Sequence, residues 1–229
     1  MPVERRIWLA LALAAVFITW LGNATDIDLA LADAAYDARL GVFPWRHAWL
    51  TEVFSHVLLK RALTGLGLLF IAAVALDMVK RQPWRHLRRK QLRVVAASAV
   101  LVPAAVALLK QFSSSHCPWD IDRYGGAEPY VRLLESLPVD VLPGNCMPAG
   151  HASSAMWLMS LAVFHLPARP RAAAGVFALC LGAGLAVGWM QQLRGAHFLT
   201  HTLWTGWIAC AIVLALISVA FRTSVRVRI

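Results

Sequence analysis

Two histidine motifs hold the residue types in this chain that are best suited to catalysis. The first motif covers residues 148–151 and ends at His151, and the second covers residues 194–201 and contains His197 and His201. A histidine can act as a nucleophile or as an acid because its pKa lies near neutrality. Each motif borders a long apolar run, so we expect both to reach the same face of a membrane. His201 follows His197 by four residues and can orient its imidazole through a hydrogen bond if both share a helix face.

The residues around these motifs favour binding of an anion such as a phosphate ester. Lys110 and Arg194 supply positive charge on the same side of the expected bundle. Gly150 lets the backbone approach an anion closely, and the first N–H groups of the following span are free to donate to it. Ser153 and Ser154 lie in that first turn and add hydroxyl donors. Attack at phosphorus is helped by such donors and by a proton for the leaving oxygen.

The composition is that of an integral membrane protein rather than of a soluble domain. Apolar residues make up 59% of the chain and charged residues 15%, whereas a soluble domain carries about 25% charged residues. A membrane span needs about 20 mostly apolar residues. Six candidate spans follow, at residues 7–23, 62–79, 94–109, 152–166, 173–190 and 202–221. There is no internal repeat and no linker, so residues 1–229 are predicted to form one domain, an all-α bundle of six transmembrane helices.

The charges predict how this bundle is oriented. Basic residues crowd the segments on one side of the six spans, above all residues 80–93, whereas most of the twelve acidic residues fall in the opposite loops. The positive-inside rule makes the basic side the cytoplasm, so we expect both termini to be cytoplasmic. The net charge of +10 is explained by orientation and by anionic lipid headgroups, so no nucleic-acid partner is expected.

Two long outer segments connect the predicted spans. Within residues 24–55, apolar positions recur at helical spacing over 27–34, which predicts a helix lying at the membrane interface with Trp45 and Trp49 as anchors. This segment is an anchored connection or a lateral gate for a lipid. The second outer segment, residues 110–151, is polar and rich in Gly and Pro, as is typical of functional loops.

The second outer segment holds two of the four cysteines, Cys117 and Cys146. An oxidising compartment favours a disulfide between them, which would restrict the loop. Two free thiols, or a zinc site that adds His116 and His151, stay open as alternatives, although adjacent His-Cys is poor ligand spacing.

The same residues resemble the signature of the type 2 phosphatidic acid phosphatase superfamily. That signature has three blocks: a lysine, six residues and Arg-Pro; then Pro-Ser-Gly-His; then Ser-Arg, five residues, a histidine, three residues and an aspartate. Here Lys110 is followed after six residues by Cys117, residues 148–151 match the second block, and His197 with His201 matches the end of the third. The resemblance runs from about residue 94 to residue 221.

The resemblance implies a catalytic role for each conserved block. His197 would be the nucleophile that forms a phosphohistidine, His151 would protonate the leaving group, and Lys110 would bind phosphate. Four positions depart from the family pattern: Cys117 and Gln191 stand for arginines, Ala149 for the serine and His201 for the aspartate. Arg194, three residues before His197, can replace the lost arginine charge.

The sequence therefore predicts a metal-independent and cofactor-independent lipid phosphatase or phosphotransferase of the bacterial inner membrane, with its site on the periplasmic or extracytoplasmic face. Its partners would be membrane lipids, and the candidate substrates are undecaprenyl diphosphate, phosphatidylglycerol phosphate, phosphatidic acid and a lipid A phosphate. The sequence does not choose among these lipids or fix an oligomeric state. Two other classes stay open: a non-catalytic lipid-phosphate binding or transport protein, and a metal or redox membrane protein that uses His116, Cys117, Cys146 and His151.

Overall fold

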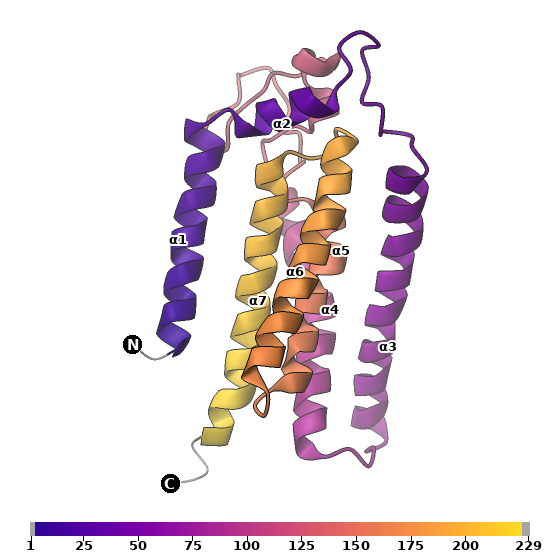
Figure 1. Cartoon of the computed structure of the whole chain (residues 1–229), viewed down its shortest axis with the longest axis vertical. Coiled ribbons are helices and arrows are strands. Elements are labelled where there is room, and N and C mark those ends of the chain that lie inside the picture. The colour runs from indigo at the N-terminus through magenta and orange to yellow at the C-terminus, as the bar shows by residue number, and fades with distance from the viewer. Residues whose placement is uncertain (1–2, 226–229) are drawn as a thin grey trace.

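A computed structural model describes residues 3–225, and within that range the chain is helical with no β-strand. The long helices stand side by side, and successive segments alternate in direction when α5 and η4 are counted as one (Figure 1). The elements in chain order are α1 (Val3–Ala24), α2 (Ile27–Ala35), η1 (Leu50–Leu59), α3 (Lys60–Val79), α4 (His86–Lys110), η2 (Pro118–Asp120), η3 (Asp122–Tyr124), α5 (Gly150–Met156), η4 (Trp157–His165), α6 (Pro170–Leu193) and α7 (Leu199–Val225).

Five helical segments of the described chain are long and apolar enough to cross a membrane. They are Arg5–Ala24, Leu50–Val79, His86–Lys110, Pro170–Leu193 and Leu199–Phe221. These segments confirm the all-helical fold and five of the six predicted spans. The start of α1 and the end of α7 lie at the same end of the bundle (Figure 1). The cytoplasmic placement of that end stays a prediction.

The remaining predicted span, residues 152–166, differs from the other five in geometry. It consists of the seven-residue α5 and the nine-residue 3-10 helix η4, so no single helix there is long enough to count as a span. A 3-10 helix rises about 2.0 Å per residue and an α-helix about 1.5 Å, so the two together extend roughly 28 Å, close to the thickness of the hydrocarbon layer. The sequence carries no signal for the 3-10 geometry.

This irregular segment lies in the centre of the bundle. No residue from Gly150 to His165 is exposed. Met156, Trp157 and Val163 join side chains of α4 and α7 in the main apolar core. Close packing with α6 depends on Gly184, because a Cβ there would lie 2.5 Å from Cγ of Met156. The core therefore fixes the helix that begins with Gly150 and His151.

The second predicted span begins earlier than the sequence indicated. A π-helical segment, η1, runs directly into α3, so one 30-residue segment extends from Leu50 to Val79, whereas the sequence placed the span at residues 62–79. Polar residues at the outer end were excluded from the predicted span, yet a helix can continue past the apolar layer. The extension brings His56 and Lys60 beside α5.

The outer end of the bundle is covered by α2 and by the loop of residues 111–149 (Figure 1). α2 is the helix that the sequence predicted at the interface. Asp33 of α2 accepts hydrogen bonds from Nε (2.8 Å) and an Nη nitrogen (2.7 Å) of Arg123 and from the Tyr124 hydroxyl (2.9 Å). These contacts attach α2 to the long loop, so the cover over the site is held by both segments.

Candidate active site

Four imidazole rings form a row at the outer end of the bundle. His151, the second residue of α5, has its ring centroid 6.1 Å from that of His197 in the turn before α7. His201 lies beyond His197 with a centroid distance of 5.8 Å, and His56 of η1 lies on the other side of His151 at 4.2 Å. The structure thus brings together the two predicted histidine motifs and adds a histidine that the sequence analysis did not select.

His197 is buried, with 3% of its surface exposed. Its Nδ1 lies 3.4 Å from Sγ of Cys146. Burial lowers the pKa of His197 well below its usual range, and the neighbouring His201 and His151 act in the same direction. A neutral imidazole is the form that attacks phosphorus. When Nδ1 carries the proton, Nε2 presents the free lone pair.

His201 does not face His197 in the way the sequence predicted. The two rings meet edge to face, and Nδ1 of His201 is buried without a hydrogen-bond partner. The nearest partner of the His197 Nδ1 is instead the sulfur of Cys146. Spacing of four residues could not predict this, because His197 precedes the helix on which His201 lies.

Cys117 and Cys146 form a disulfide, with their Cα atoms 5.4 Å apart. Cys146 is fully buried, and its backbone N–H donates to Ser115 O at 2.9 Å. In the described chain, the residues that come together as possible metal ligands are Cys117, Cys146 and His197 rather than the predicted set with His116 and His151. Because both sulfurs are bonded to each other, neither is present as the thiolate that binds zinc.

Backbone hydrogen bonds hold the three site segments against one another. Trp119 N donates to Gly195 O at 3.0 Å, which links the disulfide loop to the His197 turn. Ala149 N donates to His201 O at 3.2 Å, which links the start of α5 to α7. The positions of His151 and His197 are therefore coupled through main-chain contacts.

A cleft of about 420 Å³ opens beside His151 between α3, α4 and α5. Its outer end is lined by Lys60, Lys110 and His151, the residues at the outer ends of the three helices. The rest of its wall is mostly apolar and includes Leu63, Ile71, Pro103, Val106 and Trp157. A cavity with a cationic end and apolar walls suits an amphiphilic anion.

The predicted phosphate-binding groups of α5 also line this cleft. Gly150, Ser153 and Ser154 are part of its wall. The Ser153 hydroxyl donates to Gly150 O and the Ser154 hydroxyl to His151 O, each at 2.7 Å. The hydroxyl protons are thus used within the helix, as is common for serine, so in this structure neither hydroxyl is the free donor that the sequence predicted.

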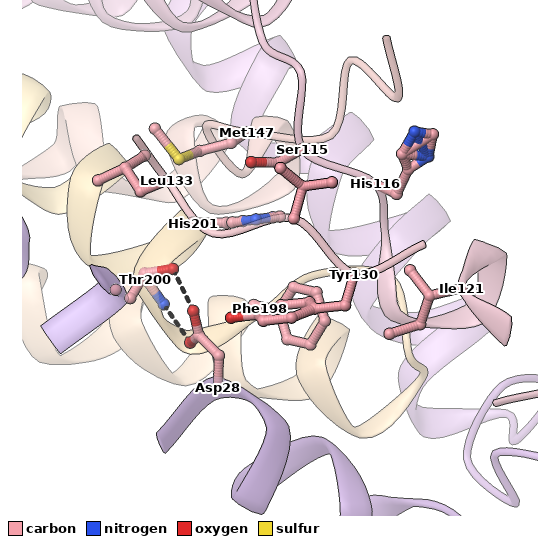
Figure 2. A pocket seen from close by; sticks show the side chains of 12 residues that line it. Asp28, Ser115, His116, Ile121, Tyr130, Leu133, Met147, Phe198, Thr200 and His201 are labelled. Atoms are coloured by element: carbon pink, nitrogen blue, oxygen red, sulfur yellow. Dashed lines mark hydrogen bonds between the residues drawn. The ribbon is translucent and has the colours of Figure 1, made fainter. Parts of the chain in front are cut away.

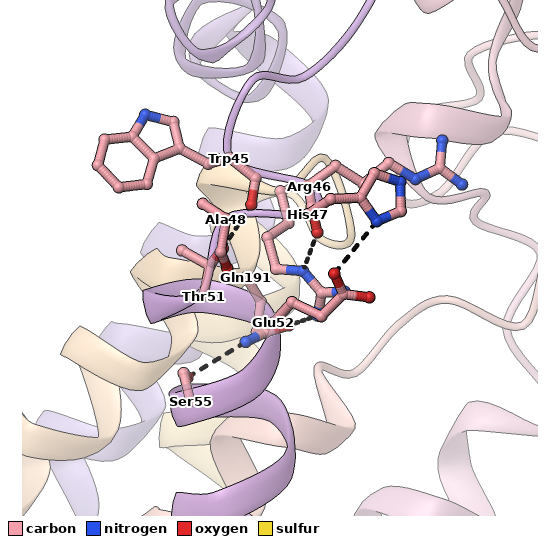
Figure 3. Close-up of polar contacts among 9 residues, drawn as sticks. Trp45, Arg46, His47, Ala48, Thr51, Glu52, Ser55 and Gln191 are labelled. Atoms are coloured by element: carbon pink, nitrogen blue, oxygen red, sulfur yellow. Dashed lines mark hydrogen bonds and ion pairs between the residues drawn. The ribbon is translucent and has the colours of Figure 1, made fainter.

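Arg194 is the predicted phosphate-binding residue that does not line the cleft. Its Nε donates to Arg46 O at 3.1 Å, one Nη donates to Oε1 of Gln191 at 2.9 Å, and the other lies 4.0 Å from Glu52. Gln191, in the position of a family arginine, donates in turn to Ser55 at 3.3 Å (Figure 3). Burial lowers the pKa of Arg194. This guanidinium therefore ties α6 to η1.

A buried carboxylate, that of Asp28, lies against Thr200 at the start of α7 (Figure 2). Asp28 of α2 accepts hydrogen bonds from Thr200 N (2.9 Å) and the Thr200 hydroxyl (2.5 Å). It lines a small cavity of about 10 Å³ together with His116, Tyr130 and His201, enough for about one water molecule. Burial raises the pKa of Asp28 above its usual value, and burial also raises the pKa of Tyr130 to about 12.

His56 and Lys60 were not among the site residues that the sequence predicted. A usable signal was present: they are four residues apart, as on one helix face, and Lys60 is a basic residue on the outer side of the bundle. Outer basic residues run against the positive-inside rule, so each one requires an explanation.

The family model that matches this chain is the PAP2 superfamily, over residues 91–224. The match covers more than half of the chain, and the chain belongs to the PAP2 superfamily, whose members are phosphatases. The matched range contains Lys110, His151 and His197, whereas His56 and Lys60 lie outside it. Comparisons with curated proteins and with solved structures gave no match.

Proposed function

We propose that the protein removes a phosphate group from a lipid phosphate or diphosphate at the outer interface of a bacterial inner membrane. The observation that carries this proposal is the cleft between α3, α4 and α5. Lys60, Lys110 and His151 make one end of it polar and cationic, and apolar side chains form most of the rest. Such a cleft accepts a phosphorylated headgroup at one end and a hydrocarbon chain along its walls.

In the first step of the proposed reaction, Nε2 of His197 attacks phosphorus and the bond from phosphorus to the lipid oxygen breaks. His151 gives the proton that the leaving oxygen needs. Burial lowers the pKa of His151 to about 3, and the negative charge of a bound phosphate acts in the opposite direction and favours the protonated imidazole. Lys110 neutralises charge on the other phosphoryl oxygens. The centroids of His151 and His197 are 6.1 Å apart, so both rings can reach one phosphoryl group.

In the second step, water attacks the phosphohistidine and His151 accepts the proton of that water. Inorganic phosphate leaves and His197 returns to its neutral form. An acceptor lipid in place of water would make the same intermediate a phosphotransferase. The disulfide next to Nδ1 of His197 fits the proposed role, because it restrains the imidazole while Nε2 reacts.

The test is phosphate release from a panel of lipid phosphates and diphosphates, in detergent with EDTA. We expect the wild type to release phosphate and His197→Ala to release none. The matched control is His86→Ala, because His86 is an exposed histidine at the opposite end of α4 and its loss should leave the rate unchanged.

Activity that persists in His197→Ala would contradict the nucleophile assignment. If the wild type releases no phosphate, labelling with a radioactive lipid phosphate separates the remaining possibilities. An acid-labile label on His197 indicates a transferase that lacks its acceptor, and binding without label indicates a non-catalytic lipid-phosphate binding protein.

A further inference from the structure

The outer part of the Leu50–Val79 helix presents three basic or titratable side chains near the cleft: His56, Lys60 and Arg61. The ring centroid of His56 lies 4.2 Å from that of His151, so the two imidazoles are in contact. None of the three residues is part of the range that matches the family model. The match to the family model therefore assigns them no role.

A second hollow adjoins the cleft on the side of this helix. It measures about 440 Å³ and is lined by His56, Lys60 and Arg61 together with neighbours on the same helix. Lys60, Thr64 and Leu68 line both cavities. The cationic end of the cleft thus continues past His151 onto η1, and an anion larger than one phosphoryl group has charged residues to contact along that direction.

The positive charges along this path are not neutralised by the protein. Among the described residues, neither Lys60 nor Lys110 takes part in an ion pair, and no acidic residue lines either cavity. The carboxylate of the same helix, Glu52, is 3.2 Å from His47 and 4.0 Å from Arg194. Attraction for an anion is stronger near an apolar wall than in water, since the effective dielectric constant is lower.

We propose that His56 and Lys60 form a second phosphate subsite, and that the preferred substrate is a lipid diphosphate. This inference rests on the function proposed above. The terminal phosphoryl group lies at Lys110, between His151 and His197, and the phosphate attached to the lipid lies at Lys60 and His56. The two phosphates of a diphosphate share one bridging oxygen, so one can contact Lys110 while the other contacts Lys60. A monophosphate would leave Lys60 without a counter-charge.

The reaction then cleaves the bridge of the diphosphate. The bond between Nε2 of His197 and the terminal phosphorus forms, the bond from that phosphorus to the bridging oxygen breaks, and His151 gives its proton to this oxygen. The leaving group is a lipid monophosphate, which Lys60 and His56 hold by its remaining charge. Water then releases inorganic phosphate from His197.

The experiment compares a C15 isoprenyl diphosphate with the matching C15 monophosphate as substrates of the full-length protein. We expect Lys60→Gln to lower kcat/KM for the diphosphate by about tenfold or more, the range for one contact to a charged group, and for the monophosphate by less than about threefold. Lys60→Arg should restore most of the preference. Lys80→Gln, the same change at the other end of α3, should leave both substrates unchanged.

Equal losses on both substrates in Lys60→Gln would overturn the second subsite and leave the phosphatase function intact. No change on either substrate would also overturn it and would make Lys60 an interfacial anchor. If the wild type turns over neither C15 lipid, binding decides the subsite, and the lipid panel described above decides the proposed function separately. A non-hydrolysable C15 methylene-diphosphonate should then bind more tightly than the C15 phosphonate, and Lys60→Gln should remove the difference. Equal wild-type affinities would refute the subsite.

Discussion

Opening the Cys117–Cys146 disulfide should disturb the site more than the transmembrane bundle, because the bridge lies entirely in the outer loop. The bridge joins residues 29 positions apart. In the chain-entropy model, closing a loop of this size lowers the entropy of the unfolded chain and so raises the free energy of unfolding by about 3.6 kcal/mol. For a domain of this length, such a loss corresponds to a fall in the melting temperature of about 7–14 °C. The double variant Cys117→Ala/Cys146→Ala should therefore be less stable by about that amount.

The same change removes the group that contacts His197, the proposed nucleophile. Sγ of Cys146 lies 3.4 Å from Nδ1 of His197, and Sγ also lies 3.2 Å from the carbonyl oxygen of Ala196. Without the bridge, the imidazole of His197 has more orientations available, and catalysis depends on its alignment with phosphorus. We expect kcat to fall by about tenfold or more at a temperature where the variant is still folded.

Thermal unfolding and phosphate release in detergent, with and without a phosphine reductant, measure both effects. Reduced wild type should match the double variant, and a thiol count should rise from the two free cysteines to all four. Cys180→Ala/Cys210→Ala is the matched control and should respond to reductant as the wild type does. A fully reduced wild type with unchanged melting temperature and unchanged kcat would refute this reasoning.

Three further perturbations test the parts that position the site. Gly195→Ala should destabilise the protein by about 2–4 kcal/mol, measured by thermal unfolding, because Gly195 has a φ of +72° and a Cβ there would lie 2.5 Å from the ring of Phe43. Asp33→Asn should lower the melting temperature at neutral pH, and this difference from the wild type should shrink as the pH falls below 3.8. Hydrogen bonds from Arg123 hold the pKa of Asp33 below its ordinary value of 3.8, so the stabilisation exists above that pH and is lost as the pH falls through the folded-state pKa. His201→Asp, which restores the family residue, should preserve or raise kcat for phosphate release, because a carboxylate supports an imidazolium.

Each of these predictions has a result that contradicts it. Gly182→Ala, where an added Cβ meets nothing within 4 Å, should leave the stability unchanged. An equal loss of stability in Gly182→Ala would mean that the close contact with Phe43 is not the cause of the loss in Gly195→Ala. If the difference in melting temperature between Asp33→Asn and the wild type stays constant from neutral pH to well below pH 3.8, the Asp33 carboxylate is not its cause. Complete inactivity of folded His201→Asp would give His201 a role of its own.

The apolar runs predicted most of the fold because a run of about 20 apolar residues can cross a membrane, and a segment that crosses must form a helix to pair its backbone polar groups. Five spans were found in this way, and the helix at residues 27–35 was found from its helical spacing. The start of the second span was missed because hydropathy reports the depth of the lipid layer, not the end of the helix. Leu50–Val79 has 30 residues, more than the about 20 that a span needs, and it includes polar residues before residue 62 that a hydropathy pattern leaves out.

The candidate site was predictable at the level of segments and not of side-chain directions. Counting spans placed His151 and His197 at one end of the bundle, and the structure has their rings 6.1 Å apart. Arg194 has the expected charge, yet its guanidinium contacts Arg46 and Gln191, because the turn that ends α6 directs it toward η1. Such directions depend on local backbone angles that residue spacing does not contain.

The segment Gly150–His165 has a consequence for how the protein is assembled. Its helices are short, each of its residues is buried or half-buried, and the turn to α6 is only four residues long. A segment of this kind gains little from contact with lipid on its own, so we expect it to enter the membrane with α6 as a helical hairpin. His151 would then reach its final position only when α4 and α7 close around that hairpin, and a chain stalled before α7 would carry no site.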